Sequence, residues 1–484
     1  MTSHNWQLDN SYQHLPGLLY AQVEPEPVVS PRMAAFNNGL AGELGLDLSS
    51  MSDEQRARLF AGNTLPEGAN PIAQAYAGHQ FGHFTMLGDG RAHLLGEQVM
   101  PDGRRFDIQL KGSGRTPYSR QGDGRAVLGP MLREYLISEA MHALGIPTTR
   151  ALAVVTTGEP VQRETPLPGA ILTRVAASHI RVGTFQFAGA TQDRSVLKAL
   201  LDYTLKRHDP DLANADNKAL ALLDAAIERQ ADLVVHWMRV GFIHGVMNTD
   251  NTALSGETID YGPCAFMDAY NPATVFSSID TNGRYAYANQ PAIIAWNLAR
   301  LAEALLPLID EDADRAVKIA EAKVNGFADI YRGKWLAMMQ AKLGLLGGDE
   351  DDYQLITDLL AWMKNNHADH TNTFRDLGSS DPPTGHPYEC KQFTAWYSRW
   401  QERLQQNGGS SKASHDLMHR TNPAVIPRNH KVEEALAAAT AGDLQPFHAL
   451  HQALQSPYQD DDALTPYQAP PEPSERVYQT FCGT

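Results

Sequence analysis

Cysteine is scarce in this sequence. The 484 residues contain only 3 cysteines, Cys264, Cys390 and Cys482, and these are widely separated. Such a small and scattered set excludes a disulfide-rich scaffold and a zinc site built from paired cysteines. Apolar burial must therefore stabilise the fold, and a chain of this length can bury a large core.

Long apolar runs and a basic leader are also lacking. No apolar run approaches the roughly 20 residues that span a bilayer. The opening MTSHNWQLDNSYQHLPG has neither the basic nor the apolar region of a secretory signal. We therefore expect a cytoplasmic protein that has no membrane partner.

Positive charge is in short supply. Lys and Arg number 40 against 56 Asp and Glu, so the formal net charge is -16. The field of such a chain repels phosphate polymers, which disfavours a nucleic-acid partner. A bound nucleotide would need locally concentrated Arg and Lys, or a metal ion.

The residues that are present change in character along the chain. Residues 1–80 mix proline-rich sequence with short helical patterns, and we expect them to form an extension packed on the rest. Residues 92–99 and 105–110 are typical of two strands joined by a hairpin turn, and Lys111 ends the second strand. A glycine-rich loop follows at 112–124.

A helix is predicted after this loop, because apolar residues recur at helical spacing over 128–136 and a Gly and a Pro end the pattern. Glu134 is expected at the edge of its buried face. Two further strand-like runs, at 151–156 and 170–175, complete a small sheet, and the chain beyond residue 190 is mostly helical. The pattern predicts an α+β fold with a small β-rich N-terminal part and a large helical C-terminal part.

Lys111 and Glu134 are the first candidates for chemistry. Transfer of part of a nucleotide requires cations around the phosphates, divalent metal ions held by carboxylate and amide oxygens, and a positioned acceptor hydroxyl. A Lys at a strand end can contact phosphate oxygens while a helical Glu orients it. The alternative is that both are solvent-exposed charges, as most Lys and Glu residues are.

Two short motifs look like the phosphoryl-transfer loop of a kinase. HGVMNTDN occupies 244–251 and IDYG occupies 259–262. Asn251 and Asp260 are predicted to provide oxygen ligands for Mg²⁺ or Mn²⁺; the alternative is that both are ordinary turn residues.

The usual catalytic aspartate is missing from the first motif. Kinases hold it two positions after the His, where this chain has Val246, whose side chain cannot accept a proton. The nearest carboxylate is Asp250, which can take the proton or orient the acceptor. The alternative is that Asp250 caps a turn.

Two arginines and two glycine turns are further nucleotide-binding candidates. Paired guanidinium groups can grip a phosphate bidentately, and glycine turns let the backbone approach it. The alternatives are surface arginines and ordinary turns, since G-D-G-R does not match G-x-G-x-x-G. The candidates are Gly88, Gly90, Arg91, Asp123, Gly124, Arg174 and Arg181.

The remaining cysteine and histidine patterns are weaker. Cys264 and Cys482 are candidates for a redox pair, with inert thiols as the alternative. His79 and His83 are spaced i, i+4, but no Glu follows the first His, so a structural role is expected rather than a metal site.

Taken together, these motifs resemble the selenoprotein O family, pseudokinases that act as protein adenylyltransferases. The resemblance covers essentially the whole chain. The matching segments are 75–82, 87–92, 109–120, 132–135, 244–262 and 482–484.

The resemblance implies a bilobal protein-kinase-like fold. Residues 1–80 would be the N-terminal extension, 81–185 the N-lobe, and 186–484 the helical C-lobe with a C-terminal extension and a flexible tail. ATP would lie flipped, so that its α-phosphate faces the acceptor. AMP would then pass to Ser, Thr or Tyr hydroxyls of proteins as pyrophosphate leaves, and UMP transfer also stays open.

Carried over by position, the resemblance also implies a role for each candidate. Lys111 and Glu134 form an ion pair, Asp250 accepts the proton, and Asn251 and Asp260 bind the metal. In animal members the position of Cys482 holds selenocysteine. The implied nucleotide contacts are Gly88, Gly90, Arg91, Lys111, Asp123, Gly124, Arg174, Arg181 and Asp260.

Two other functions stay open. A kinase-like phosphotransferase for a small metabolite is favoured by the His-Gly opening that aminoglycoside-kinase relatives share, but Val246 removes their base. An inactive nucleotide-binding scaffold conflicts with the presence of Lys111, Asp250 and Asp260. The sequence leaves open the protein substrates, AMP or UMP as the group transferred, Mg²⁺ or Mn²⁺, the oligomeric state and whether the two cysteines pair.

Overall fold

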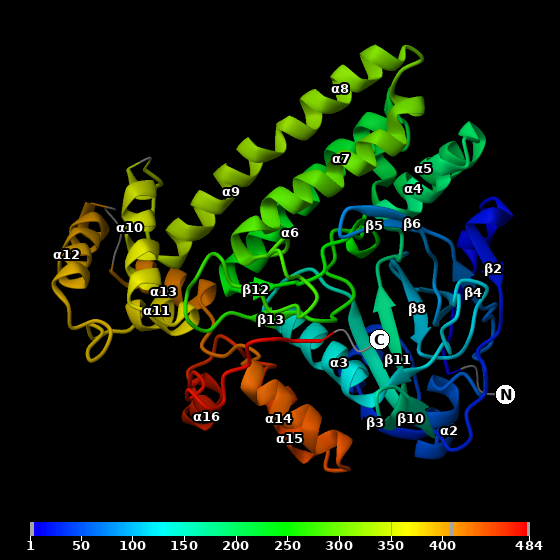
Figure 1. The fold of residues 1–484 in the computed structure, drawn as a ribbon, viewed down its shortest axis with the longest axis horizontal. Coiled ribbons are helices and arrows are strands. Elements are labelled where there is room, and N and C mark those ends of the chain that lie inside the picture. The colour runs from blue at the N-terminus through cyan, green and yellow to red at the C-terminus, as the bar shows by residue number, and fades with distance from the viewer. Residues whose placement is uncertain (1–3, 350, 407–410, 482–484) are drawn as a thin grey trace.

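The computed structural model describes residues 4–349, 351–406 and 411–481. An antiparallel sheet forms the N-terminal part, and a largely helical part follows it (Figure 1). This arrangement confirms the predicted mixed α+β class and the order of its two parts.

The main sheet has nine strands among the described residues. Its order is β2-β4-β7-β8-β11-β10-β3, with β1 paired to β7 and β9 to β11, and every pairing is antiparallel. The strands are β1 (Leu8–Asp9), β2 (Tyr20–Gln22), β3 (Arg32–Phe36), β4 (Ile72–Gln74), β7 (Ala92–Val99), β8 (Arg105–Lys111), β9 (Ala126–Val127), β10 (Arg150–Gln162) and β11 (Pro166–Ala176).

The predicted hairpin at 92–110 is confirmed, and Lys111 is the last residue of β8 as expected. Lys111 lies opposite Ala92 of β7 and Leu172 of β11, so its backbone is held from both sides. This pairing places its side chain near the middle of the sheet. The strands predicted at 151–156 and 170–175 are longer than expected, because β10 and β11 continue into a hairpin beyond the apolar runs.

Residues before position 80 take part in this sheet. They contribute β1 to β4 and two helices, α1 (Asn38–Glu43) and α2 (Asp53–Phe60). Ser52 caps α2 and forms a reciprocal capping box with Gln55, which satisfies backbone donors at the helix start. Apolar side chains of both helices pack in one cluster with residues of β8, β10 and β11.

Helix α3 (Leu128–Ala143) crosses the other face of the sheet, against β10 and β11. It ends at Leu144, and Gly145 takes the left-handed conformation that stops the helix, as the sequence predicts. Helices α14 (Asn429–Thr440) and α15 (Gln445–Ala453) cover its outer side (Figure 1). Glu134 is only 3% exposed, because its side chain faces Lys111 of β8 and Arg174 of β11, and it does not lie at the edge of a buried face as predicted.

The helical part begins after β11. Its other helices are α4 (Val182–Ala190), α5 (Arg194–His208), α6 (Lys218–Val240), α7 (Gln290–Ile309), α8 (Ala313–Asn325), α9 (Phe327–Lys342), α10 (Asp352–Asn365), α11 (His370–Leu377), α12 (Lys391–Gln406), α13 (Ser411–Thr421) and α16 (Thr465–Gln468). Single-turn 3-10 helices are η1 (Ser11–His14), η2 (Gly17–Leu19), η3 (Pro210–Leu212), η4 (Thr249–Asn251), η5 (Tyr287–Asn289) and η6 (Asp462–Leu464).

One described segment, Tyr287–Ile309, is long and apolar enough to cross a membrane by length and composition alone. The sequence-based statement that no apolar run approaches this length was too strict. The segment contains α7, which packs against α4, α6 and α8, and the core helix of a soluble protein passes the same test.

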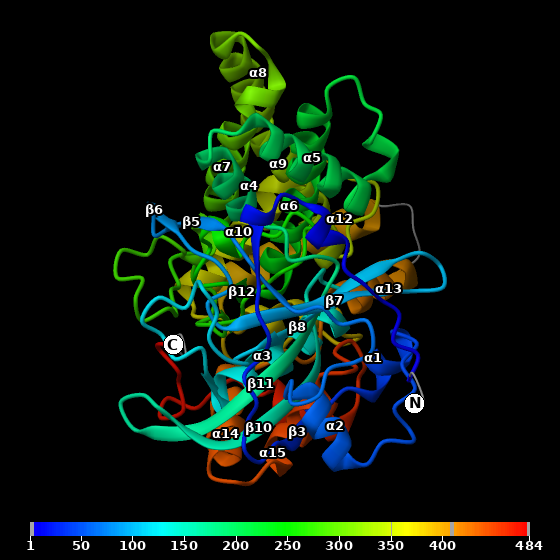
Figure 2. The same cartoon turned by 90° about the vertical axis from the view of Figure 1, so that its right-hand side faces the viewer.

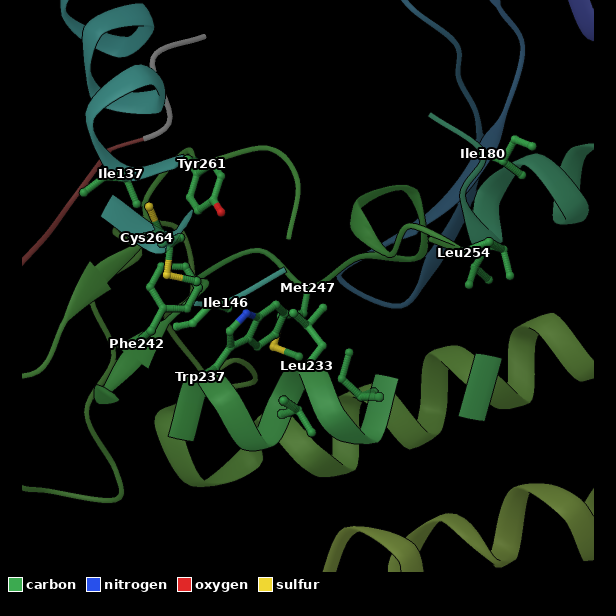
Figure 3. Packing of buried hydrophobic residues seen from close by; sticks show 14 of the residues in the cluster. Ile137, Ile146, Ile180, Leu233, Trp237, Phe242, Met247, Leu254, Tyr261 and Cys264 are labelled. Atoms are coloured by element: carbon green, nitrogen blue, oxygen red, sulfur yellow. The ribbon is translucent and has the colours of Figure 1, made fainter. Parts of the chain in front are cut away.

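The two predicted motifs lie between a pair of short strands. β12 (Phe242–Ile243) pairs with β13 (Ala265–Phe266), and η4 lies in the segment that connects them. One apolar cluster continues from α3 through α6 to this segment, and Figure 3 shows Ile137, Trp237, Phe242 and Tyr261 within it. The loop is thus anchored on a core that both parts of the fold share.

Candidate active site

A cleft of about 640 Å³ lies where the sheet meets the helical part. It collects ten of the residues singled out in the sequence, which come from both halves of the fold. These are Gly88, Gly90, Arg91, Lys111, Asp123, Gly124, Arg174, Arg181, Asp250 and Asp260.

A network of charges forms one wall of this cleft. The Nζ of Lys111 donates to Oε2 of Glu134 at 2.7 Å and to Oδ1 of Asp260 at 2.9 Å. Arg174 of β11 donates through Nε to Oε1 of Glu134 at 2.8 Å and through Nη2 to Oδ1 of Asp260 at 2.6 Å. The predicted Lys111–Glu134 pair is therefore present, and Arg174 and Asp260 close it into a four-membered network.

The two carboxylates in this network are held ionised. Burial opposes the charge of Glu134, but Arg174 and Lys111 outweigh it and lower the pKa of Glu134. Burial likewise opposes the charge of Asp260, but Arg174, Lys111 and Arg181 together hold its pKa well below the usual range. At neutral pH the network therefore combines fixed cations with fixed anions.

Arg181 extends the positive charge across the cleft. It precedes α4 and is almost fully buried, with Nη2 at 3.5 Å from Oδ2 of Asp260 and Nη1 at 3.6 Å from Oδ1 of Asp89. Its guanidinium also lies 4.4 Å from the ring centre of Tyr76. Lys111, Arg174 and Arg181 therefore gather three cations on one wall of the cleft, each paired with a buried or partly buried carboxylate.

Asp250 lies in the same cleft and differs from the other carboxylates. It is 8% exposed, and burial raises its pKa to about 6. Its Oδ1 atom is buried and makes no hydrogen bond with any described residue. A carboxylate with a raised pKa and an unused oxygen is suited to accept a proton near neutral pH.

The loop that carries Asp250 is held by a hairpin far away in sequence. Strands β5 (Ala77–Gln80) and β6 (His83–Met86) form a separate antiparallel pair beside η4. The backbone N–H of His79 donates to Oγ1 of Thr249 at 2.7 Å, and that of Phe81 donates to Oδ1 of Asn248 at 3.0 Å. Sequence reasoning missed this contact, since nothing in the two segments signals that they meet.

His79 has the structural role that was expected. Its Nδ1 lies 2.7 Å from Nε2 of Gln186, and its ring packs edge-on against Trp296. His83 is exposed at the start of β6. Within residues 4–349, 351–406 and 411–481, no group of three or more His, Cys, Asp or Glu side chains is arranged to hold a metal.

Two glycines in the cleft wall are required by close packing. Gly88 has φ +149°, and a Cβ there would lie 2.4 Å from the ring of Tyr118. Gly124 has φ +69°, and a Cβ there would lie 2.2 Å from the carbonyl carbon of Gly114. Both positions line the cleft and accept only glycine, because a side chain there would clash with its neighbours.

Asp123 and Asn251 already have protein partners. Oδ2 of Asp123 accepts from Nη1 of Arg163 at 2.7 Å, and this pairing lowers the pKa of Asp123. Nδ2 of Asn251 donates to the carbonyl of Val246 at 2.9 Å, and Asn251 is not among the residues that line the cleft. The role of Asn251 as a metal ligand stays a prediction.

Several cleft residues were not found from the sequence. Tyr76, Gln80, Asp89, Gln109 and Arg163 all line the cavity. Asp89 had a local signal, because it stands between Gly88 and Gly90. The others reach the site only through the pairing of distant segments.

The predicted redox pair is only partly within the described chain. Cys264 is fully buried in the core near Tyr261 (Figure 3), and Cys482 lies outside the described residues. The backbone of Thr480 donates to the carbonyl of Phe276 at 2.7 Å, and its hydroxyl donates to the carbonyl of Pro263. Pairing of the two cysteines stays a prediction.

Comparisons with known proteins define the class. A family model described as "Protein adenylyltransferase SelO" matches residues 3–455. Three curated relatives carry the name "Protein nucleotidyltransferase YdiU". The one from Nitrosococcus oceani is 58% identical over 480 residues, which cover 99% of this chain and 97% of that protein. The one from Syntrophotalea carbinolica is 58% identical over 484 residues, 100% and 98% of the two chains. The one from Halalkalibacterium halodurans is 59% identical over 481 residues, 99% and 98% of the two chains.

These matches define a protein nucleotidyltransferase. The chain belongs to the SelO family of protein adenylyltransferases, since the family model spans most of its length and the relatives match nearly all of it. The resemblance noted in the sequence is confirmed, and so is the predicted class of enzyme, a nucleotidyltransferase that AMPylates proteins.

Proposed function

We propose that the cleft binds ATP with its α-phosphate facing Asp250 and passes AMP to a Ser, Thr or Tyr hydroxyl of a protein. The observation that carries this is Asp250 itself: a buried carboxylate with an unused oxygen lines the same cavity as Lys111, Arg174 and Arg181. We also propose a bilobal kinase-like architecture, supported by a strand lysine that pairs with a helical glutamate between a β-rich and a helical part.

In the proposed reaction, the carboxylate of Asp250, which lines the cleft, takes the proton of the acceptor hydroxyl. The hydroxyl oxygen then forms a bond to the α-phosphorus, and the bond from that phosphorus to the β-bridging oxygen breaks. Pyrophosphate leaves with the electron pair, and Arg174, Arg181 and Lys111 stabilise its charge. Val246 is buried and apolar, so the usual kinase base is absent from the loop.

Divalent cations match the donor chemistry of Asp260, which lines the cleft, and of Asn251, which follows Asp250 in η4. Asp260 offers carboxylate oxygens, Asn251 an amide oxygen, and Mg²⁺ and Mn²⁺ prefer such ligands. When bound, such a cation supplies charge neutralisation for the triphosphate. Asn251 and Asp260 are the residues proposed to hold it.

We propose further that the protein acts in the cytoplasm on protein acceptors, without nucleic acid or membrane as a partner. The net charge of -16 supports this, because long-range repulsion disfavours anionic polymers and lipid surfaces. UMP in place of AMP is a variant of the same chemistry at the same phosphorus.

Transfer of label tests the proposal directly. The full-length protein is incubated with ATP labelled at the α- or the γ-phosphate, with Mg²⁺ or Mn²⁺ and denatured casein as the acceptor, and with Asp250→Asn as the matched variant. AMP transfer is supported if the wild type places label from the α-phosphate on protein and the Asp250→Asn variant does not. Label only from the γ-position indicates a kinase, and nucleotide binding without either transfer indicates a scaffold; both contradict the proposal.

A further inference from the structure

The outer edge of β6 is open. Within the part of the chain that the structure describes, β6 pairs with β5 alone, and these two strands form a separate sheet. Figure 2 shows this hairpin as a projection at one edge of the molecule. An unpaired strand edge presents backbone N–H and C=O groups that can pair with another extended chain.

The exposed face of this strand is apolar. Phe84 and Met86 are two residues apart, so their side chains point to the same side of β6. They are 48% and 49% exposed, which is unusual for such large apolar side chains. An open edge and an apolar stripe thus occur together on one short strand.

This strand lies directly beside the cleft. Its partner β5 places Gly78 against the carboxylate of Asp250 and Gln80 in the cavity wall. The chain after β6 runs straight into Leu87 and Gly88, which line the same cavity. Met86 at the end of β6 adjoins Leu87 and Gly88, so one end of a polypeptide paired along β6 would lie at the edge of this cavity.

Two arginines beside the stripe lack acidic partners. Nη2 of Arg120 donates to the carbonyl of Met86 at 3.0 Å. Arg284 lies 4.9 Å from the ring centre of Trp296, which packs on His79 of β5. Neither arginine forms an ion pair with a described residue, and Nε of Arg284 is a buried donor without a described hydrogen-bond partner. These are local positive charges on a protein whose net charge is -16.

We propose that β6 is the docking strand for the acceptor protein. An extended acceptor segment adds to its edge as a further strand, sets apolar side chains on Phe84 and Met86, and places acidic side chains near Arg120 or Arg284. The hydroxyl to be modified then enters the cleft beside Asp250. This inference rests on the proposed function, because it names the acceptor of that transfer.

The test uses synthetic peptide acceptors with the full-length protein. One ten-residue peptide carries a single Ser between alternating Val and Asp residues, a second replaces Asp by Lys, and a third is the first with N-methylated backbone amides. Transfer is measured with α-labelled ATP over a range of peptide concentrations. The first peptide is expected to have a KM about tenfold lower than the other two, since they lose charge attraction or main-chain pairing.

Protein variants test the same surface. Phe84→Ser combined with Met86→Ser, and separately Arg284→Glu, are expected to raise the KM for the first peptide about tenfold, with the KM for ATP unchanged. Val317→Ser is the matched control, because Val317 is an exposed apolar residue on α8. If the double variant fails to fold, the comparison of the three peptides with the wild-type protein still tests whether the acceptor docks on β6.

The outcomes separate this inference from the function on which it rests. If the wild type transfers α-label to none of the three peptides or casein, the proposed function is wrong. If it transfers equally to all three peptides, or if the Phe84 and Met86 variant behaves like the Val317 control, only the docking strand is wrong. A wild-type dimer that the double variant converts to monomer, with no change in peptide KM, would show that the edge pairs with a second copy instead.

Discussion

Gly78 and Asp250 are in direct contact across 172 residues of sequence (250 − 78 = 172). A Cβ atom built on Gly78 would lie 2.2 Å from Oδ1 of Asp250 and 2.7 Å from its carboxyl carbon. The position of the proposed proton acceptor is therefore set by the absence of a side chain on β5.

This contact predicts that Gly78→Ala displaces the carboxylate of Asp250. Misplacing a reacting group by about 1 Å lowers the rate on the order of 100-fold, so AMP transfer should fall by that much while ATP affinity is kept. Steady-state transfer and ATP titration measure the two quantities. Gly333→Ala is the control, since nothing lies within 4 Å of a Cβ at that helical position; equal activity in both variants would contradict the contact's role.

The pKa of Asp250 predicts the pH dependence of transfer. Burial raises this pKa to about 6, and the carboxylate must be ionised to accept a proton. The rate should therefore rise with pH through about 6 and level off above it. Asp250→Asn should lower the plateau by roughly 10²- to 10⁴-fold and remove this limb of the profile. An unchanged acid limb in the variant would assign the titration to another group.

The same pKa predicts an effect on stability of opposite sign. The folded-state pKa of Asp250 is raised from 3.8 to about 6, so the folded protein binds this proton more tightly than the unfolded chain. The stabilisation is complete below pH 3.8 and is lost as the pH rises through 6. Above pH 6, Asp250→Asn should raise the free energy of unfolding by about 3 kcal/mol.

Chemical denaturation of wild type and Asp250→Asn across pH 4 to 8 measures this difference. Other buried groups, such as Glu257 with a pKa raised by burial to about 7, are common to both proteins and cancel in the comparison. A variant less stable than wild type at pH 8 would contradict the assigned burial of Asp250.

Asp260 should couple nucleotide binding to the metal. Asp260→Ala removes the carboxylate that faces Lys111, Arg174 and Arg181, and leaves those cations to bind phosphate without it. We expect transfer to be abolished and the ratio of ATP affinities with and without Mn²⁺ to fall to about one. Calorimetric titration gives this ratio, and Asp102→Ala, which removes an exposed carboxylate in a turn, is the control. An undiminished ratio would remove Asp260 from the metal site.

Much of the local structure follows from sequence periodicity. The strands β7 and β8 and the start of α3 lie where the alternating and helical patterns place them. Such signals are local, because side chains two, three or four positions apart share a face. The strands predicted at 151–156 and 170–175 are shorter than β10 and β11, because the outer part of this hairpin has no apolar run that would indicate a strand.

Burial and long-range pairing could not be predicted from the sequence. Glu134 carries no local sign of its burial, which depends on how α3 packs on the sheet, and the closure of its ion pair by Arg174 depends on strand register. The hairpin β5–β6 holds the loop of Asp250 through backbone donors, which any residue except proline possesses. The residue types in these segments therefore do not indicate that such a contact forms.

The sequence by itself determined the class of fold, the order of its elements and the identity of the charged residues, because residue type and spacing are properties of the chain. The tertiary structure alone decided which of these charges meet, how far each is buried and which atom of Asp250 is left without a partner. Those properties depend on distances between segments far apart in sequence, and such distances exist only once the chain has packed.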